Sequence, residues 1–407
     1  MDKIKAGVIG YGQRGHGMLS LLLDMPEKVE IVGVCDLFED RMEAAQKKVK
    51  DKGGYDCKGT TNAYELIDDP DVNTIYIFAA WEAHIPLSIY AMKAGKAVAC
   101  EVAGAYSIQQ CWDLVKTYEE TKTPIMMLEN CCYGKAETTV LRMVRAGLFG
   151  EVVHCEGGYR HDLRNEIANG EKNRHYRLEE YKNRNCENYP THEIGPIAKL
   201  LNINNGNRFV SLVSTASKSV GMTEYLKVKK PEMADTKFNQ GDIVTTTIKC
   251  HNGETVTITL DTTLPRFYSR DFAVYGTKGM YDERTNSVFL DNGFEGCGEV
   301  TLAYDGFTAS ALYSKIYDSS RPSMICGENG CIFINKLSVP AWATIELRGK
   351  EPQPLPVTMT ENNMVYEVRD FVGLVRDGAV EHPYTDTTAA VMRIMDKARA
   401  IAGVKFD

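Results

Sequence analysis

Apolar runs recur through the first 130 residues, and polar segments with helical periodicity separate them. The runs that we predict to be strands lie at residues 4–9, 29–35, 74–80, 97–100 and 124–128. The segments that we predict to be helices lie at residues 16–24, 41–52, 63–67, 85–94 and 108–121. The runs lack polar alternation, which is typical of parallel strands that are buried on both faces. The pattern therefore predicts an α/β domain over residues 1–130, built on a doubly wound, mostly parallel sheet.

The pattern changes after residue 130. A helix is predicted at residues 138–146, and two more at 363–376 and 385–402 are predicted to close the chain. Polar and apolar positions alternate in the segments between, which we predict to be strands at residues 152–159, 209–215, 242–250, 255–262 and 272–275. Alternation indicates antiparallel strands with one wetter face. We expect a second, α+β domain over residues 131–407 with a large, mainly antiparallel open sheet; residues 280–345 are assigned only to strands and long loops.

A glycine-rich turn, residues 10–15, joins the first predicted strand to the first predicted helix. In a Rossmann unit the first glycine permits the tight turn, the second lets backbone amides approach a pyrophosphate, and the third lets the helix pack on the strand. Asp36 ends the second strand about 20 residues further on, where this fold places its ribose-binding acid. A merely structural glycine turn is the weaker alternative.

The acid also bears on which dinucleotide binds. A carboxylate repels a 2′-phosphate, so NAD is favoured over NADP, although Arg41 lies close in the sequence. The predicted cofactor contacts in this unit are Gly10, Gly12, Gln13, Arg14, Gly15, Asp36 and Arg41.

Composition and charge narrow the functional classes. At 407 residues, with 43% hydrophobic and 25% charged positions, the chain suits two globular domains. A net charge of -8 argues against a nucleic-acid-binding surface, which needs clustered basic residues. No apolar run approaches a membrane span, and the first strand leaves no room for a signal peptide, so we expect no membrane contact and a cytoplasmic protein. The 12 cysteines lack a repeated metal-type spacing and are expected to be reduced thiols.

Polar and aromatic residues follow the predicted strands of the first domain. They are Trp81, His84, Glu101, Glu129 and Asn130. Ligands of a doubly wound sheet bind beyond the carboxyl ends of its strands, so we expect these residues to line the ligand crevice.

Three segments of the second domain concentrate side chains that can move protons: residues 157–164, 188–196 and 264–270. A strand through the first segment would put Tyr159 and His161 on one face. A helix that starts near Pro190 would bring Tyr189 and His192 together, and an imidazole at a helix N-terminus is biased toward its neutral, proton-accepting form. A lone tyrosine or histidine is more often structural. Two such segments in the domain that faces the nicotinamide favour Tyr159 and His192 as catalytic residues.

The remaining histidines are read more plainly. His154, His161 and His175 are each predicted either to be structural or to support the residues that contact the ligands. The scattered histidines predict no metal site.

Several stretches resemble the glucose-fructose oxidoreductase and inositol dehydrogenase superfamily over nearly the whole chain: residues 10–15, 80–86 and 101–103. Longer stretches resemble its glycosidase branch, the NAD-dependent alpha-N-acetylgalactosaminidases: residues 126–130, 147–151, 157–164, 189–192 and 264–270. The resemblance implies NAD as cofactor and a homo-oligomer formed through the open sheet. It adds cofactor contacts at Ala80, Trp81, His84, Glu101, Val102 and Asn130.

One departure favours the glycosidase branch. Dehydrogenases of the superfamily usually carry Glu-Lys-Pro after the fourth strand, and the lysine carries their proton. This chain has Glu101-Val102-Ala103 there. Valine cannot titrate, so an ordinary alcohol dehydrogenation would lose its expected base.

The glycosidase resemblance implies a redox-neutral hydrolysis of a small-molecule glycoside. NAD takes hydride from the sugar C3, the new ketone acidifies the C2 proton, loss of that proton expels the C1 group, water adds, and the hydride returns. In this scheme His192 handles the C3 hydroxyl proton, Tyr159 takes the C2 proton, Tyr189 orients the sugar, and Glu129 assists at the leaving group or water. A phenol titrates near about 10, so Tyr159 would need a lowered pKa or a proton relay.

Further substrate contacts are predicted at Tyr268, His161 and Arg164. Two other functions stay open from the sequence. A conventional NAD-dependent sugar or polyol dehydrogenase, with His192 as base, would accumulate NADH. A non-enzymatic NAD or sugar sensor would bind its ligand without turnover.

Overall fold

The computed structural model of the chain describes residues 3–102, 104–291, 297–304, 307–314, 323–327, 329–335, 342–357 and 364–377. The chain forms two compact units. Unit 1 comprises Met1–Thr138, Cys155–Phe272 and Asn363–His382, and unit 2 comprises Thr139–His154, Ala273–Asn362 and Pro383–Asp407. The domain boundary expected at residue 130 lies inside unit 1, and the division into domains 1–130 and 131–407 stays a prediction.

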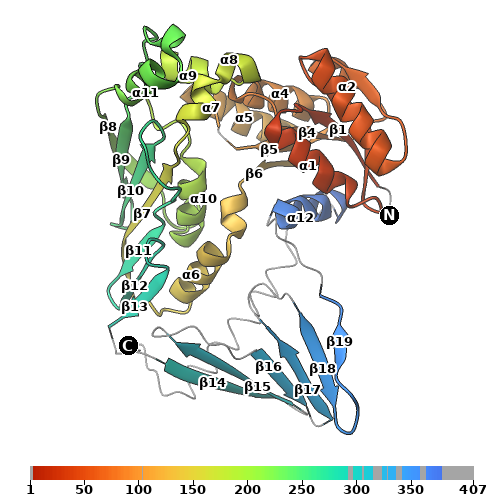
Figure 1. Cartoon of the computed structure of the whole chain (residues 1–407), viewed down its shortest axis with the longest axis vertical. Coiled ribbons are helices and arrows are strands. Elements are labelled where there is room, and N and C mark those ends of the chain that lie inside the picture. The colour runs from red at the N-terminus through yellow and green to blue at the C-terminus, as the bar shows by residue number, and fades with distance from the viewer. Residues whose placement is uncertain are drawn as a thin grey trace. The chain divides into compact units, whose positions relative to one another are not determined.

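The N-terminal part of unit 1 is the predicted Rossmann sheet (Figure 1). Its six parallel strands lie in the order β3-β2-β1-β4-β5-β6, so the strand order reverses beside β1. The strands are β1 (Ile4–Ile9), β2 (Val29–Cys35), β3 (Lys58–Thr60), β4 (Thr74–Ile77), β5 (Ala97–Glu101) and β6 (Ile125–Leu128). The short strand β3 was not predicted, because its three residues are mostly polar and carry no apolar run.

Helices cover both faces of this sheet. One face packs on α1 (Gln13–Leu23) and α2 (Glu39–Lys48), and α2 continues into the π-helix η1 (Val49–Gly53). The other face packs on α3 (Ala63–Asp68), α4 (Trp81–Lys93) and α5 (Ile108–Thr121). Helix α4 begins four residues before its predicted start at residue 85, which places Trp81 and His84 in its first turn.

The C-terminal helix α12 (Met364–Asp377) completes the first of these cores. Val368, Phe371 and Val372 are buried there, and the Phe371 ring meets the edge of Tyr76 at 5.7 Å between centroids. The first predicted closing helix is thus confirmed. The second, at residues 385–402, lies outside the described residues.

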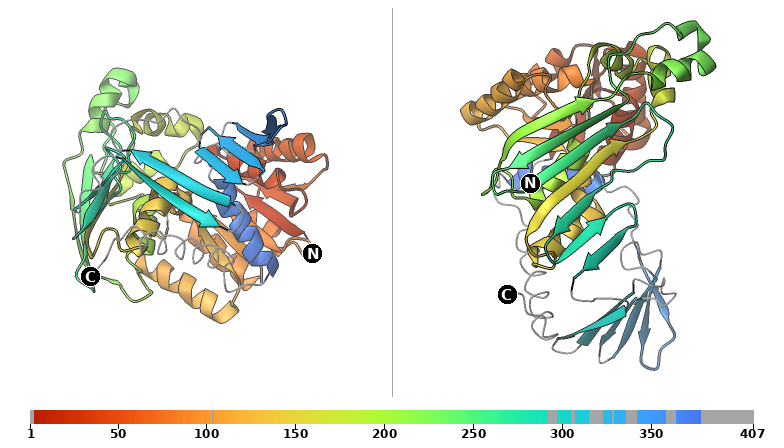
Figure 2. Two further views of the ribbon diagram at one scale, coloured as in Figure 1. Left: turned by 90° about the horizontal axis from the view of Figure 1, so that it is seen from below. Right: turned by 90° about the vertical axis from the view of Figure 1, so that its left-hand side faces the viewer.

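A second sheet of unit 1 carries strands in the order β7-β10-β9-β8. They are β7 (Val152–Arg160), whose first three residues belong to unit 2, β10 (Thr255–Asp261), β9 (Ile243–Cys250) and β8 (Phe209–Ala216). β10 pairs with β9, and β9 with β8, in antiparallel register. Helix α10 (Thr191–Leu200) lies against this sheet, since a Cβ at Gly157 of β7 would approach the Glu193 Cβ to 2.7 Å (Figures 1 and 2).

Shorter helices complete unit 1 around that sheet. They are η2 (Asn130–Tyr133), α7 (Arg164–Ala168), α8 (Gly170–Asn173), α9 (Arg177–Asn183), α11 (Gly221–Lys229) and η3 (Pro231–Met233). Helix η2 follows β6, the last Rossmann strand, and packs against α10, the helix that lies against the second sheet.

Unit 2 is built mainly of antiparallel strands. Strands β11 (Ala273–Gly276), β12 (Gly279–Asp282) and β13 (Ser287–Leu290) pair in sequence, and α6 (Lys135–Arg145) lies mostly in this unit. A separate sheet has the order β14-β15-β16-β17-β18-β19. Its strands are β14 (Cys297–Tyr304), β15 (Phe307–Ser314), β16 (Ser323–Gly327), β17 (Gly330–Ile334), β18 (Ala343–Leu347) and β19 (Gln353–Leu355).

The expected fold class is therefore confirmed, with one addition. The sequence predicts one large antiparallel sheet, and the structure adds the separate sheet β14–β19, most of whose strands lie in residues 280–345, where only strands and long loops are expected. Among the described residues, no helix has the length and apolar character that a membrane crossing requires.

The packing of α12 predicts a large loss of stability when its aromatic anchor is truncated. Replacing the fully buried Phe371 by alanine removes the ring against Tyr76 and leaves a cavity, which should cost roughly 3–5 kcal/mol of unfolding free energy. Urea unfolding measures this cost. The matched control is Arg369→Ala on the exposed face of the same helix, which should change stability by less than about 0.5 kcal/mol. Equal effects of the two substitutions would contradict this packing.

Candidate active site

The glycine turn has the backbone that a dinucleotide site requires. Gly10 adopts φ +95°, and a Cβ there would lie 2.6 Å from the backbone of Phe78. A Cβ at Gly15 would clash with the Gly10 carbonyl oxygen, so close helix–strand packing excludes a side chain. Gly12 is the N-cap of α1 and faces open space, which leaves room for a phosphate at the helix N-terminus.

Asp36 is buried and fixed at the end of β2. Its two carboxylate oxygens accept hydrogen bonds from the amides of Tyr11 at 2.7 Å and Phe38 at 3.0 Å. Arg41 donates to the carbonyl oxygen of Asn173 at 2.6 Å and lies over the Phe38 ring at 5.0 Å. Arg41 thus donates to a carbonyl oxygen, and the acid at the end of β2 is Asp36. This arrangement suits a ribose diol better than a 2′-phosphate.

Glu101 connects the glycine turn to the crevice. Arg14 pairs with its Oε1 at 2.9 Å, and its Oε2 accepts the amide of Val102 at 2.8 Å. Burial raises the pKa of Glu101 above its ordinary value, and the positive charge of Arg14 offsets part of that rise. Val102 is fully buried in one apolar cluster with Trp81 and Tyr189, so the position of the usual proton-carrying lysine is here an apolar wall.

The other predicted cofactor contacts surround the start of α4 and of η2. Ala80 is the N-cap of α4, Trp81 is buried, and an imidazole nitrogen of His84 lies 3.0 Å from the Ala79 carbonyl oxygen. His84 therefore fixes the strand–helix turn. The Asn130 Oδ1 atom is buried and has no hydrogen-bond partner among the described residues, so it can accept from a carboxamide of a bound nicotinamide.

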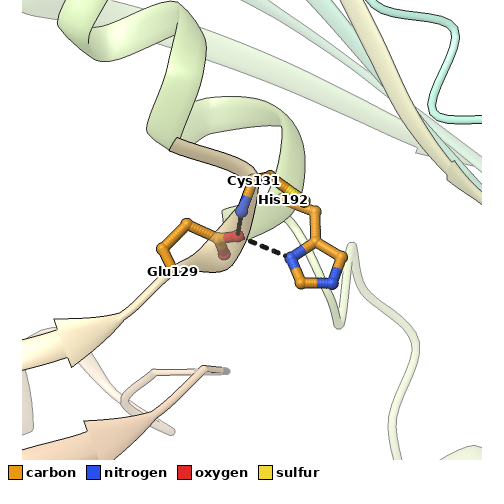
Figure 3. A group of neighbouring side chains, drawn as sticks. All are labelled: Glu129, Cys131 and His192. Carbon is orange, nitrogen blue, oxygen red and sulfur yellow. Dashed lines mark hydrogen bonds and ion pairs between the residues drawn. The ribbon is translucent and has the colours of Figure 1, made fainter. Parts of the chain in front are cut away.

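Glu129 and His192 form a buried hydrogen-bonded pair (Figure 3). Glu129 follows β6, and its Oε1 accepts the Cys131 amide at 2.9 Å and lies 2.8 Å from Nδ1 of His192. His192 occupies the first turn of α10, two residues after Pro190. Burial raises the pKa of Glu129, but the hydrogen bond and charge of His192 outweigh it and hold that pKa below its ordinary value. Glu129 is therefore an anion that orients the imidazole.

Two tyrosines stand beside this pair, as predicted. The rings of Tyr159, at the end of β7, and Tyr189 lie 4.2 Å apart between centroids. The His192 ring lies 4.9 Å from Tyr189 and 5.8 Å from Tyr159. Trp81 of α4 is 5.7 Å from Tyr189, so the aromatic cluster reaches the Rossmann part of the unit. The structure thus brings together Glu129, Tyr159, Tyr189 and His192.

Arg177, on α9, is a site residue that the sequence analysis missed. Its guanidinium is buried, hydrogen-bonds Tyr159, pairs with Glu166, and lies over the rings of Trp81 at 5.5 Å and Tyr189 at 5.4 Å. Burial raises the pKa of Tyr159, and Arg177 opposes that rise. The available signal was weak, because Arg177 is one of several charged residues in an unremarkable helical segment.

Of the remaining predicted substrate contacts, His161 and Tyr268 lie next to the cluster, whereas Arg164 pairs with Asp162. The Tyr159 hydroxyl lies 3.4 Å from Nδ1 of His161, and the His161 ring meets Tyr268 at 5.2 Å between centroids. Tyr268 is 53% exposed on its loop. Arg164 makes a two-pronged pair with Asp162, at 2.8 and 2.6 Å, and its contact with substrate stays a prediction.

The same cluster contains three possible metal ligands. Atoms of Glu129, Cys131 and His192 lie within 4.8 Å of one another. Ligands of a tetrahedral zinc lie about 3.3–3.7 Å apart, whereas Glu129 Oε1 and His192 Nδ1 are 2.8 Å apart. Burial also raises the pKa of the Cys131 thiol, which disfavours the thiolate that a metal needs. The geometry suits a pair that handles protons. The absence of a metal site stays a prediction.

Two further buried carboxyl groups, Glu187 and Glu193, lie near the site. Burial raises the pKa of Glu187 to about 8, against the backbone amides of Tyr189 and Leu260, which lower it. Burial and the neighbouring Glu187 raise the pKa of Glu193 well above its ordinary value. Both groups are therefore mainly neutral acids at neutral pH, in contrast to Glu129.

Two family profiles match consecutive parts of the chain. Residues 4–128 match the oxidoreductase family with an NAD-binding Rossmann fold, and residues 133–319 match the glycosyl hydrolase 109 C-terminal domain. A glycosyl hydrolase family 109 protein of Stenotrophomonas maltophilia (strain K279a) is 38% identical over 316 residues, covering 71% of this chain and 69% of the relative. An alpha-N-acetylgalactosaminidase of Tannerella forsythia is 37% identical over 314 residues, covering 71% and 67%.

Solved structures resemble the fold over nearly the whole chain. An oxidoreductase domain protein from Kribbella flavida superposes with a TM-score of 0.61 at 16% identity, covering 98% of this chain and 97% of that one. A myo-inositol 2-dehydrogenase from Lactobacillus plantarum gives a TM-score of 0.57 at 16% identity, covering 99% and 98%. At this identity the likeness concerns the fold alone.

The neutral Glu187 predicts how stability depends on pH. The folded-state pKa of about 8 exceeds the ordinary 4.5, so the unfolding free energy falls as pH rises from about 4.5 to about 8 and levels off above that. Glu187→Gln cannot ionise and escapes this loss. It should exceed the wild type by roughly 3–5 kcal/mol at about pH 9, and by much less at about pH 5.

Urea unfolding across that pH range measures the difference between the two proteins. Glu232→Gln, on the exposed part of η3, is the matched control and should follow the wild type at each pH. A gap between Glu187→Gln and wild type that does not grow with pH would contradict a neutral, buried Glu187.

Proposed function

This chain belongs to glycosyl hydrolase family 109, and we propose that its Glu129, His192, Tyr159 and Tyr189 cluster cleaves the glycosidic bond. It is an NAD-dependent glycosidase on an oxidoreductase-family scaffold. The observation that carries the residue assignment is the buried Glu129–His192 hydrogen bond beside the Tyr159–Tyr189 stack. The apolar Val102 supports the same assignment, because a dehydrogenase would need a titratable group there.

The glycine turn, Asp36 and Asn130 would hold NAD, which would supply a reversible hydride acceptor for the sugar C3. The protein's own task is then to move two protons in order, one from the C3 hydroxyl and one from C2. Both protons must leave and return within one catalytic cycle, since hydrolysis has no net redox change.

His192 is suited to the first proton. With Nδ1 bound to the Glu129 carboxylate, its Nε2 is left to accept the proton of the C3 hydroxyl. The anionic Glu129 stabilises the imidazolium that forms, as the acid of a catalytic triad does.

Tyr159 is suited to the second proton. Its phenol lies beside Tyr189 and His192, and Arg177 hydrogen-bonds it and favours the phenolate. Removal of the C2 proton next to the C3 ketone lets the C1 group leave, after which water adds at C1. Tyr189, stacked on Tyr159 and Trp81, orients the sugar ring.

The relative from Tannerella forsythia suggests the substrate class. We take a 2-acetamido galactoside as the first substrate to test, because that relative is an alpha-N-acetylgalactosaminidase. A homo-oligomer is supported by the edge strand β8, where Val210, Leu212 and Val213 are exposed. A cytoplasmic site of action is supported by the free thiols of the cysteines from Cys35 to Cys250 and of Cys331.

The reaction route has a direct test by proton NMR in D2O. The protein, supplied with NAD, is mixed with 4-nitrophenyl N-acetyl-α-D-galactosaminide and with the free sugar. The proposed route predicts release of 4-nitrophenol, deuterium at C2 of the sugar product, and no accumulation of NADH. Stoichiometric NADH from the free sugar, with no deuterium at C2, would instead mean a dehydrogenase.

Substitution of the two proton carriers should separate the two steps. Tyr159→Phe should lower deuterium exchange at C2 by about 10²–10⁴-fold while reduced cofactor still forms in a single turnover. His192→Ala should lower formation of reduced cofactor itself, because the C3 hydroxyl then lacks its base. Stopped-flow absorbance of the reduced nicotinamide and NMR follow the two steps.

A tyrosine outside the site provides the control for this pair. Tyr118→Phe, on the exposed face of α5, should keep wild-type rates in both measurements. Wild-type turnover in both Tyr159→Phe and His192→Ala would refute the assignment of the two protons.

A further inference from the structure

The Tyr159 phenol has a second polar neighbour besides Arg177. Nδ1 of His161 lies 3.4 Å from the Tyr159 hydroxyl, and the two rings meet edge to face at 5.9 Å between centroids. The two residues are two positions apart where β7 ends, so they lie on one face of the chain. The His161 amide donates to the Asp261 carbonyl oxygen at 3.0 Å, which holds this histidine to β10.

Groups from several elements face the His161 ring. Arg177 of α9 and Glu166 of α7 act on it electrostatically, as does Asp162 next to it, and the ring edge of Tyr268 closes one side. Burial lowers the pKa of His161, and Arg177 lowers it further, against Glu166 and Asp162. The imidazole is therefore neutral at neutral pH and has a free nitrogen lone pair when the proton sits on Nε2.

Tyr159 cannot act as a base without such a neighbour. A phenol that keeps its proton cannot accept another one, and burial makes the free phenolate costly even with Arg177 beside it. Glu166 is already paired with Arg177, and Arg177 holds no lone pair, so neither accepts the phenolic proton. Among the described residues, the imidazole nitrogen of His161 is the remaining acceptor at the hydroxyl.

We propose that His161 accepts the phenolic proton of Tyr159 as Tyr159 takes the C2 proton of the oxidised sugar. The C2–H bond breaks, a new O–H bond forms on Tyr159, and the former phenolic proton moves to Nδ1 of His161. The electron pair of the C2–H bond enters the enolate, which expels the C1 group, and the proton returns when C2 is protonated again. His161 acts through Tyr159 and need not touch the sugar; the inference rests on the proposed function.

The relay predicts a distinct pH dependence for the step at C2. In the wild type, deuterium exchange at C2 should be level over neutral and mildly alkaline pH, because neutral His161 is always ready to accept. In His161→Gln, Tyr159 must ionise unaided, so exchange should be about 10²-fold slower at about pH 7 and should rise about tenfold per pH unit toward the tyrosine pKa.

The test measures three quantities on the NAD-loaded protein with 4-nitrophenyl N-acetyl-α-D-galactosaminide. They are exchange at C2, release of 4-nitrophenol, and the absorbance of reduced nicotinamide in a single turnover. In His161→Gln the reduced nicotinamide should accumulate, since oxidation at C3 proceeds and the following step is slow. Exchange that is unchanged, or lowered equally at every pH, would overturn the relay.

Two controls separate the possible failures. His161→Phe keeps the ring that packs on Tyr268 and removes the nitrogen, so it should repeat the steep pH dependence; a level profile there would also overturn the relay. His251→Gln, in the exposed turn between β9 and β10, should match the wild type. Absence of C2 exchange and of transient reduced nicotinamide in the wild type would refute the proposed function itself, and with it the relay that rests on it.

Discussion

The hydrogen bond between Glu129 and His192 is the interaction on which the site depends. It joins the end of the Rossmann strand β6 to the first turn of α10, two elements separated by 63 positions in the chain. Both side chains are about nine-tenths buried, so the pair must stay matched: a buried carboxylate without a partner would cost several kcal/mol. That constraint fixes the imidazole beside the carboxyl end of β6, the edge of a doubly wound sheet at which ligands bind.

Around this hydrogen bond, charged side chains lie among aromatic ones. Arg177 is buried among Trp81, Tyr189 and Tyr159, and its pairing with Glu166 compensates for the desolvation of the guanidinium. The arrangement keeps water from most of the cluster, and each electrostatic interaction is stronger in the less polar surroundings. The side chains proposed for catalysis are thus also part of the packed core of the site.

Sequence patterns predicted the parts of this site that local rules determine. The glycine turn, Asp36 and the strand ends follow from spacing, and the proximity of Tyr189 and His192 follows from a helix that begins near Pro190. The pairing of His192 with Glu129 was not predicted, because it depends on how η2 packs against α10. Arg177 was missed for a similar reason: its segment shows a charged surface pattern, and only tertiary packing buries it. The sheet β14–β19 was missed because its short strands lack a clear period.

His192 and Tyr159, the two proposed proton carriers, have hydrogen-bond partners of opposite charge. This difference suits a redox-neutral cycle. His192 hydrogen-bonds an anion, Glu129, whereas Tyr159 hydrogen-bonds a cation, Arg177, which opposes the rise that burial causes in the Tyr159 pKa. In the proposed route His192 would take the proton of the C3 hydroxyl and Tyr159 the proton of C2, and each would later give a proton back. Val102 leaves no third titratable group at the position between cofactor and sugar where dehydrogenases carry a lysine.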